Sequence, residues 1–342
     1  MPFDAERLEL TGTATSVLEG VHTSPTSGLG YFTVSNSGAL AYLPGGQAEM
    51  ERQLVLVDRQ GKGTPIVDER SNFMSPHFSP DGTKVAVERF EGSARRTIWV
   101  FDLVSGARIR LTTGGENGMP IWTPGGDRVT YWSDYETIQS KVVGSDSSDE
   151  LYRSHHPIFP TSQTPGGEEL VFFEFHPETR SDIWVLSADG EAHPWLATEF
   201  SEGYPRLSPD GRWLAYVSNE SGRYEVYVQD YQGAGEKMTV STDGGYEPLW
   251  SPDGRELFYR IGASVMAVSF HTEPVFRSNR PIEIIKGPYV SGATISAVAT
   301  TYDVAPDGEH FLMIEGSEEE GANQLHLVLN WFEVLNRVAP TD

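Results

Sequence analysis

The sequence predicts an all-β protein, a seven-bladed β-propeller built from four-stranded antiparallel sheets. Three observations lead to this prediction. A turn containing Pro, Asp and Gly recurs at a nearly constant spacing, strand-like apolar runs surround it in a fixed order, and these runs carry apolar side chains on both faces. Repeats that cannot bury their own apolar faces stack on one another, and a ring of such sheets leaves no end sheet exposed.

The repeated turn is Ser-Pro-Asp-Gly where it is best preserved. Its copies end at Gly38, Gly82, Gly126, Gly167, Gly211, Gly254 and Gly308. The steps between successive copies are 44, 44, 41, 44, 43 and 54 residues. Pro fixes φ, Asp caps the turn with its own side chain and Gly supplies a positive φ. Each copy is therefore expected to join two strands as a hairpin.

The strands of each repeat follow one order. A short apolar strand precedes the turn, a second follows it, and a third and a fourth come after a polar loop. The third strands are the clearest, for example at 97–102 (TIWVFD), 182–187 (DIWVLS) and 225–230 (EVYVQD). In 213–218 (WLAYVS) both alternating faces carry bulky apolar side chains, so this strand must be covered on both sides. Radial stacking of sheets provides that cover.

The two ends of the chain indicate how the ring closes. The last repeat shows three strands before the chain stops, and residues 14–21 (ATSVLEGV) precede the first turn without partners of their own. We predict that residues 14–21 complete the last blade, so that residues 1–342 form a single domain. Six blades are the alternative, because the last step is long and the third turn copy is degenerate.

Composition limits the classes of function. With 25 basic and 49 acidic residues the net charge is −24, which repels phosphate backbones, so no nucleic-acid partner is expected. No apolar run approaches the length of a membrane span, and the start (MPFDAERLEL) lacks the pattern of a signal peptide. The absence of cysteine excludes disulfides and thiolate chemistry. A closed ring has no free sheet edges, which favours a monomer.

The repeat of an apolar strand, Ser-Pro-Asp-Gly, a second strand, a loop and Asp-Ile-Trp-Val resembles the WD40-like PD40 repeats of TolB-type propellers over the whole chain. Segments 208–228 (SPDGRWLAYVSNESGRYEVYV), 241–260 (STDGGYEPLWSPDGRELFYR) and 327–338 (LVLNWFEVLNRV) also resemble the extracytoplasmic propeller regions of bacterial serine/threonine kinases. This resemblance implies a binding or sensing ring in a bacterial periplasm or at the cell surface. Kinase chemistry is not implied, because the phosphate loop and catalytic loop of kinases are absent.

No strong catalytic motif is present. The sequence contains neither the Gly-x-Ser-x-Gly elbow of serine hydrolases nor the His-Glu-x-x-His motif of zinc proteases. Propeller sites can instead be assembled at the mouth of the central channel from loops of different blades. The segments entering the innermost strands offer Asn72, His77, Glu116, Asn117, His155, His156, Glu202 and Glu247. These residues could equally be solvated loop and rim positions that the repeat itself places there.

The leading hypothesis is a non-catalytic propeller that binds a protein, peptide or small ligand at the channel mouth. The alternative is a metal-dependent hydrolase or lyase with its site in the channel. Mixed His and carboxylate ligands would suit Zn²⁺ or Mn²⁺, and carboxylates with Asn oxygens would suit Ca²⁺. A third possibility is a structural module of a larger assembly.

Overall fold

The computed structural model describes residues 3–4, 7, 9–10, 16–21, 30–43, 52–91, 95–233, 237–271, 277–291, 299–316 and 325–338. The chain divides into two compact units, one of residues 51–316 and one of residues 1–50 and 317–342. This division differs from the single domain expected from the sequence. The physical reason is that the two strands joined by the first turn copy, at Gly38, pair with each other, and the second of them pairs with the C-terminal segment 326–328.

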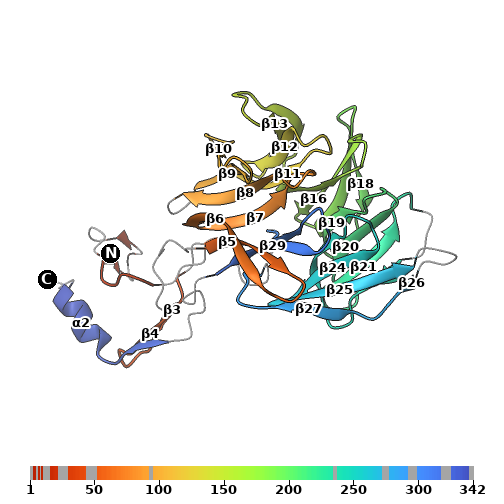
Figure 1. Ribbon diagram of the computed structural model, residues 1–342. Helices are drawn as coiled ribbons and strands as arrows, with labels where there is room; N and C mark the ends of the chain where they lie inside the picture. The colour runs from red at the N-terminus through yellow and green to blue at the C-terminus, as the bar shows by residue number, and fades with distance from the viewer. Residues whose placement is uncertain are drawn as a thin grey trace. The chain divides into compact units, whose positions relative to one another are not determined.

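The larger unit is built from six antiparallel sheets, which we call blades I to VI (Figure 1). Blade I consists of β7 (Phe73–Phe78), β8 (Lys84–Glu91), β9 (Arg95–Asp102) and β10 (Arg108–Arg110). Blade II consists of β11 (Asn117–Trp122), β12 (Arg128–Ser133), β13 (Thr137–Val142) and β14 (Asp149–Arg153). Blade III consists of β15 (Ile158–Gln163), β16 (Glu169–His176), β17 (Arg180–Ser187) and β18 (Ala192–Leu196).

Blades IV to VI complete the set. Blade IV consists of β19 (Glu202–Leu207), β20 (Trp213–Ser218), β21 (Glu225–Asp230) and β22 (Met238–Thr239). Blade V consists of β23 (Tyr246–Trp250), β24 (Glu256–Ile261), β25 (Ser264–His271), β26 (Arg277–Ser278) and β27 (Ile282–Lys286). Blade VI consists of β28 (Tyr302–Val304), β29 (His310–Glu315), β5 (Arg52–Asp58) and β6 (Gly63–Ser71). The all-β propeller of four-stranded antiparallel sheets is confirmed, with a fifth strand, β27, added in blade V.

The first strands of the blades form a closed circle. Each of β7, β11, β15, β19, β23 and β28 contacts the first strand of the next blade, and β28 contacts β7 again. Six of the seven turn copies lie in this circle, so the alternative count of six describes the blades of this unit. The remaining copy, which is the first in the chain and ends at Gly38, joins β3 (Phe32–Val34) to β4 (Leu40–Tyr42) in the smaller unit.

Blade VI closes the ring with strands from both ends of the unit. β29 pairs with β5, with Leu312 opposite Leu56 and Met313 opposite Val55. The sequence predicted residues 14–21 for this place, and the structure corrects that prediction. Residues 16–20 form no strand, and residues 14 and 15 lie outside the described residues. β5 fits better because its apolar side chains are buried along most of its length, which satisfies a strand inside a sheet.

The core lies between the blades. All six residues of β20 are buried, as the two apolar faces of this strand predicted. Trp213, Ala215 and Val217 pack toward side chains of blade V, including Leu257. Leu214 and Tyr216 pack on the other face, toward blade III. Each blade therefore hides its apolar faces only against its two neighbours, which is the stabilising principle of repeat architectures.

The repeated turns behave as the sequence predicted. Asp210 Oδ1 accepts hydrogen bonds from the Ser208 hydroxyl at 2.5 Å and from the Arg212 backbone N–H at 3.1 Å, and Gly211 has φ of +72°. The turns also touch one another around the ring. A Cβ added to Gly211 would lie 3.0 Å from Pro165 Cδ of the previous turn, and one added to Gly82 would lie 3.1 Å from Pro306 Cγ.

The same Gly-to-Pro contact recurs at every blade. Its members are Gly82 with Pro306, Gly126 with Pro80, Gly167 with Pro124, Gly211 with Pro165, Gly254 with Pro209 and Gly308 with Pro252. We call this circle the Pro-Gly collar. All six glycines have a positive φ, which favours Gly. At Gly82 and Gly211 the neighbouring Pro also leaves little room for a Cβ, whereas at the other four the Pro lies at an ordinary contact distance of 3.4–4.0 Å.

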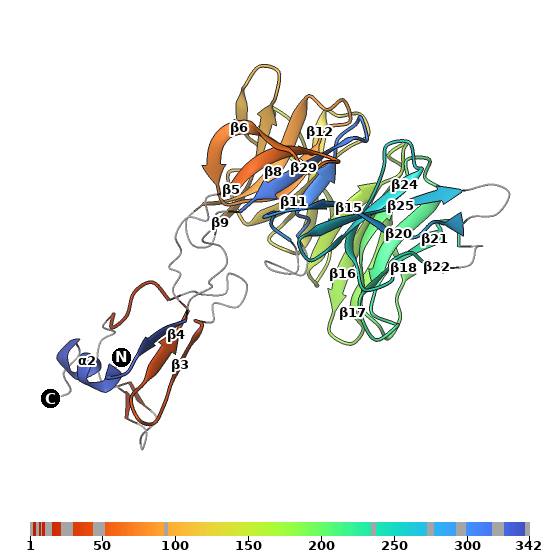
Figure 2. The ribbon, with the colours of Figure 1, turned by 60° about the horizontal axis from the view of Figure 1, so that its bottom comes forward.

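The smaller unit contains β1 (Phe3–Asp4) paired with β2 (Glu9–Leu10), and a three-stranded sheet of β3, β4 and β30 (His326–Val328) followed by helix α2 (Trp331–Val338) (Figure 2). The backbone N–H of Trp331 donates to the carbonyl of Gly38 at 2.8 Å, so the helix is anchored to the first turn copy. The last repeat therefore contributes two strands, β28 and β29, to blade VI and not the three expected from the sequence, because β30 pairs with β4. No helix among the described residues is long and apolar enough to cross a membrane.

Candidate binding site at the mouth of the ring

The two faces of the ring carry different parts of each blade. The Pro-Gly collar follows the ends of the first strands, so it lies on one face. The opposite face carries the beginnings of the first strands and the ends of the second strands, because these strands are antiparallel, with Asn117 opposite Ser133 and Glu202 opposite Ser218. We call this opposite face the mouth. The sequence predicted the functional residues there.

The first strands bend where they pass the channel. In four of them a non-glycine residue with positive φ directly precedes a proline, namely Ser75, Met119, Tyr204 and Glu247, with φ between 47° and 53°. The pairing register shifts at each of these positions. A bulge of this kind re-aims side chains, and a strained backbone that recurs in several blades is held by the surrounding structure.

Two of the predicted residues, His77 and Glu247, belong to a buried network at the centre. The Glu247 carboxylate accepts hydrogen bonds from the Thr301 N–H at 2.6 Å and from the Thr301 hydroxyl at 2.8 Å. Burial lowers the pKa of His77, and the negative charge of Asp303 opposes that shift. Asp303 in turn accepts from the Phe78 backbone N–H at 2.7 Å. This network ties blades V, VI and I together.

Arg206 supplies positive charge to the same network. Its guanidinium donates to the carbonyl of Thr161, and its backbone carbonyl accepts from Trp250 Nε1 at 3.0 Å. Burial lowers its pKa, while Asp303, Tyr302 and Glu247 act in the opposite direction. Because a buried carboxylate needs partners, Glu247 contributes to joining blades V and VI. The half-buried His77 ring lies beside this network, with its Nδ1 3.2 Å from the carbonyl of Phe78 in its own strand.

Glu202 has a different environment, between blades III and IV. Its side chain is 1% exposed, and one oxygen accepts from the Thr198 hydroxyl at 2.5 Å. Its other oxygen has no hydrogen-bond partner among the described residues, and the same holds for Oδ1 of the buried Asp182. Burial, with a contribution from the charge of Asp182, raises the pKa of Glu202 to about 7. This carboxyl can therefore gain or lose a proton near neutral pH.

Asn72 and Asn117 make structural hydrogen bonds. Asn72 Oδ1 accepts from Arg52 Nη1 at 2.8 Å, which connects blade I to blade VI. Asn117 is buried and donates to the carbonyl of Gly114 at 2.6 Å, which holds the loop that leads into β11. Both side chains are engaged by the protein.

The two adjacent histidines lie in the loop before β15. His155 is exposed, and His156 is half-buried, with its ring 4.9 Å from that of His176 in an edge-to-face arrangement. Among the described residues, no group of three or more His, Asp or Glu side chains is placed to hold a metal ion. The donors that the sequence offered for Zn²⁺, Mn²⁺ or Ca²⁺ are thus distributed over different blades.

Aromatic side chains gather at the mouth, and sequence reasoning missed them. Met119, Trp132, Phe159 and Phe173 form a buried cluster with Tyr135 and Phe175 packed partly exposed against it. The rings of Trp132 and Tyr135 stack at 4.3 Å, and those of Phe159 and Phe173 at 5.0 Å. We call these six residues the aromatic mouth cluster. The only sequence signal is the run of aromatic residues near the ends of β12 and β16.

Glu116 belongs to the rim of this cluster. It is half-buried, and its carboxylate lies 3.7 Å from Nε of Arg96. Burial raises the pKa of Glu116, and the positive charge of Arg96 opposes that shift. The guanidinium of Arg96 in turn lies over the rings of Trp132 and Tyr135. The mouth therefore combines aromatic surface with carboxylates.

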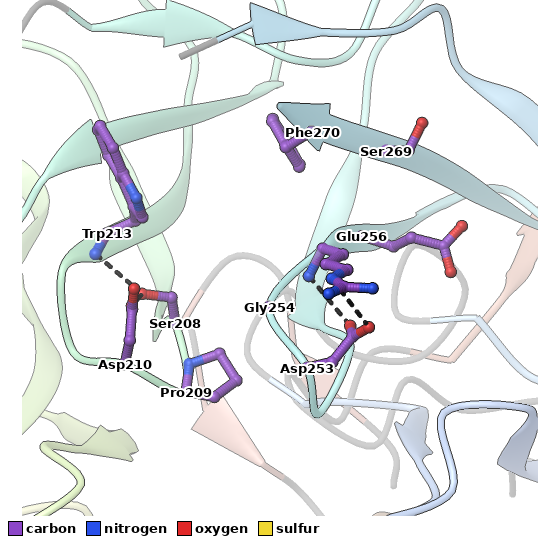
Figure 3. Close-up of a pocket in the computed structure, with 10 residues that line it drawn as sticks. Ser208, Pro209, Asp210, Trp213, Asp253, Gly254, Glu256, Ser269 and Phe270 are labelled. Atoms are coloured by element: carbon purple, nitrogen blue, oxygen red, sulfur yellow. Dashed lines mark hydrogen bonds and ion pairs between the residues drawn. The ribbon is translucent and has the colours of Figure 1, made fainter. Parts of the chain in front are cut away.

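A cleft lies on the other face, between the turns of blades IV and V (Figure 3). Its volume is about 910 Å³, and Trp213 and Phe270 line it together with the turn residues Pro209, Asp210 and Asp253. The next interface is closed by Arg59, whose guanidinium binds Glu256 at 2.5 Å. The interface between blades III and IV is bridged by the Tyr231 hydroxyl, which donates to Glu169 at 2.8 Å.

The chain resembles TolB proteins in sequence. It is 28% identical to the Tol-Pal system protein TolB of Francisella tularensis subsp. holarctica over 207 residues, which cover 56% of this chain and 47% of TolB. It is also 36% identical over 84 residues to the uncharacterized peptidase YuxL of Bacillus subtilis, covering 24% of this chain and 13% of YuxL. The chain thus spans about half the length of the matched TolB and less of YuxL. No protein-family model matches it.

Solved structures show the same fold. A putative TolB from Agrobacterium tumefaciens has a TM-score of 0.60 and 16% identity, covering 79% of this chain and 99% of that one. An oligogalacturonate lyase in complex with manganese has a TM-score of 0.52 and 15% identity, covering 89% of this chain and 82% of that one. The predicted resemblance to TolB-type bacterial propellers is confirmed.

Proposed function

We propose that this protein is a non-catalytic binding propeller whose mouth engages a protein or peptide partner. The partly exposed edge of the aromatic mouth cluster, at Tyr135 and Phe175, carries the proposal. Aromatic rings with a polar rim are the usual anchors of protein interfaces, because they bury large areas at a small cost in side-chain entropy. The TolB-like fold supports a binding role, and the resemblance supports an extracytoplasmic location. The closed ring supports a monomeric state.

Site-specific photo-crosslinking tests this proposal. A photoreactive phenylalanine analogue at Tyr135 or Phe175, at the partly exposed edge of the cluster, should form covalent adducts with a partner in extracts of the source cells. The matched control is Val104, which is 81% exposed in the turn between β9 and β10. Adducts from Val104 as abundant as those from Tyr135, or none from either mouth position, would contradict binding at the mouth.

The metal-dependent alternative has a direct test. Because the described residues bring no three ligands together, chelation should leave the melting temperature unchanged, and adding Ca²⁺, Zn²⁺ or Mn²⁺ should not raise it. Elemental analysis of the purified protein provides the second measurement. A stoichiometric metal whose removal lowers the melting temperature would favour the hydrolase or lyase.

A further inference from the structure

Arg96 of β9 occupies an aromatic cage between blades I and II. The carbon at the centre of its guanidinium lies 4.8 Å from the centre of the Phe90 ring, 5.6 Å from that of Trp132 and 5.7 Å from that of Tyr135. The side chain is 11% exposed. Three rings around one cation attract it through their negative faces, more strongly where water is excluded.

Two carboxylates complete the cage, but both lie at long range from the Arg96 guanidinium, although Glu116 also accepts a hydrogen bond from the Arg96 backbone. Arg96 Nη1 lies 3.5 Å from Glu88 Oε1, and Nε lies 3.7 Å from Glu116 Oε2. Other arginines of blade I pair at much shorter range, such as Arg110 with Glu91 at 2.7 Å. Glu88 is 1% exposed, and its Oε1 has no hydrogen-bond partner among the described residues. A buried carboxylate oxygen is thus directed into the cage without the hydrogen bond it needs.

The floor of the cage depends on a glycine. A Cβ added to Gly118 would lie within 2.7 Å of two atoms of the Trp132 indole and of Glu88 Oε2. Gly118 therefore lets the indole and the carboxylate approach the same point. The cage is a built feature of the interface between blades I and II, with two acidic groups for one basic group.

We propose that this cage recognises the guanidinium of an arginine side chain supplied by a partner, and that Arg96 is an internal ligand which that arginine displaces. The planar guanidinium can stack on the rings and still direct N–H groups to both carboxylates, which an ammonium cannot do as well. The net charge of −24 favours a basic partner. The proposal rests on the proposed function, because the arginine belongs to the partner bound at the mouth.

Competition with Arg96 sets the apparent affinity. A cage that is open for roughly a tenth of the time binds an external ligand about tenfold more weakly than an open cage does. Removing Arg96 should therefore strengthen binding of an arginine ligand. If Arg96 were instead part of the surface that contacts the partner, its removal would weaken binding, so the direction of change separates the two roles.

The test compares Arg96→Ala with the wild-type chain, using N-acetylarginine amide as the probe and the neutral isostere N-acetylcitrulline amide as its control. We expect the arginine probe to raise the melting temperature of Arg96→Ala and to bind it about tenfold more tightly than wild type. The citrulline probe should have no effect. The matched variant is Arg110→Ala, which removes an arginine lying over one ring, Trp99, and paired with Glu91. It should gain no affinity.

The outcomes are separable. Equal responses of wild type, Arg96→Ala and Arg110→Ala, or no response of Arg96→Ala, would overturn the proposal. If Arg96→Ala does not fold, Arg96→Val keeps a side chain that suits a β-strand but is too short to fill the cage, and should show the same gain. Failure of both variants to fold would assign Arg96 a structural role and would also overturn it. If Tyr135 forms crosslinks but Arg96→Ala gains no affinity for the arginine probe, the proposed function stands and only the proposal of an arginine-binding cage fails.

Discussion

At the scale of single residues, Glu202 shows how the ring controls a carboxyl group. Its ionised form is disfavoured by burial, and the nearby Asp182 adds negative charge. The folded-state pKa of about 7 lies above the ordinary value of 4.5 for a glutamate. The folded protein therefore binds more protons than the unfolded chain between these two values, and its stability falls as the pH rises through that window.

Glu202→Gln should remove this dependence. The amide mimics the protonated carboxyl and can donate toward Asp182, so the variant should lose less stability than wild type between about pH 5 and about pH 8, by roughly 1–2 kcal/mol after allowance for solvent screening. Urea unfolding at a series of pH values measures the difference.

The matched control is Glu199→Gln, an exposed residue of the same loop. It should follow the wild-type pH profile. A wild-type profile for Glu202→Gln would mean that the Glu202 carboxyl titrates normally in the folded protein.

Glu202 also shows what the sequence could predict about the site. Its place at the entry to a first strand, on the mouth face, followed from the repeat. Its burial did not, nor did the proximity of Asp182, since that contact depends on how blades III and IV pack. The aromatic mouth cluster was missed for the same reason. In the sequence nothing distinguishes Phe159, Phe173 and Trp132 from ordinary core residues, because their contact exists only where two blades pack together.

At the scale of elements, the turns were the best-predicted feature. Pro, Asp and Gly have the conformations and hydrogen bonds that their chemistry requires. What the sequence did not reveal is the Pro-Gly collar, because a contact between one turn and the next exists only in the assembled ring. The bulges of the first strands were also missed, although each has a proline directly after the bulged residue.

The collar makes Gly211→Ala a sharp test. Its matched control is Gly106→Ala, because Gly106 has φ of +73° against +72° for Gly211 but nothing within 4 Å of an added Cβ. Both variants should lose about 1–2 kcal/mol from the positive φ. Gly211→Ala should lose about 1–2 kcal/mol more, because its Cβ would meet Pro165. Denaturant unfolding gives both values.

Changing the proline checks the cause. In the double variant Gly211→Ala with Pro165→Ala the extra loss should largely disappear, measured against Pro165→Ala alone. Equal losses for Gly211→Ala and Gly106→Ala would show that the collar contact contributes nothing to stability.

At the scale of the whole molecule, the propeller architecture followed from the periodicity, whereas its closure did not. The apolar run of β5 follows the turn at Gly38 as a third strand would, and nothing local distinguishes it from a strand that pairs with β29. The turn at Gly38 counted as an equal copy, yet it belongs to the smaller unit. Pairing between β5 and β29, which lie near opposite ends of the unit, depends on which strand offers the better apolar surface, and a repeat count does not contain that information.

Closure joins the two ends of the ring, because β5 completes the sheet of β28 and β29 and these strands contact β7 of blade I. The most direct measurement is disulfide formation in Gln53→Cys with Glu315→Cys, two positions directly opposite in this ladder, in a chain that has no other cysteine. Paired positions lie close enough for an unstrained bond. Oxidation of the folded protein should link them within one chain, while the single-cysteine variants stay free of internal bonds. Two free thiols in the folded, oxidised double variant would contradict a ring closed by β5.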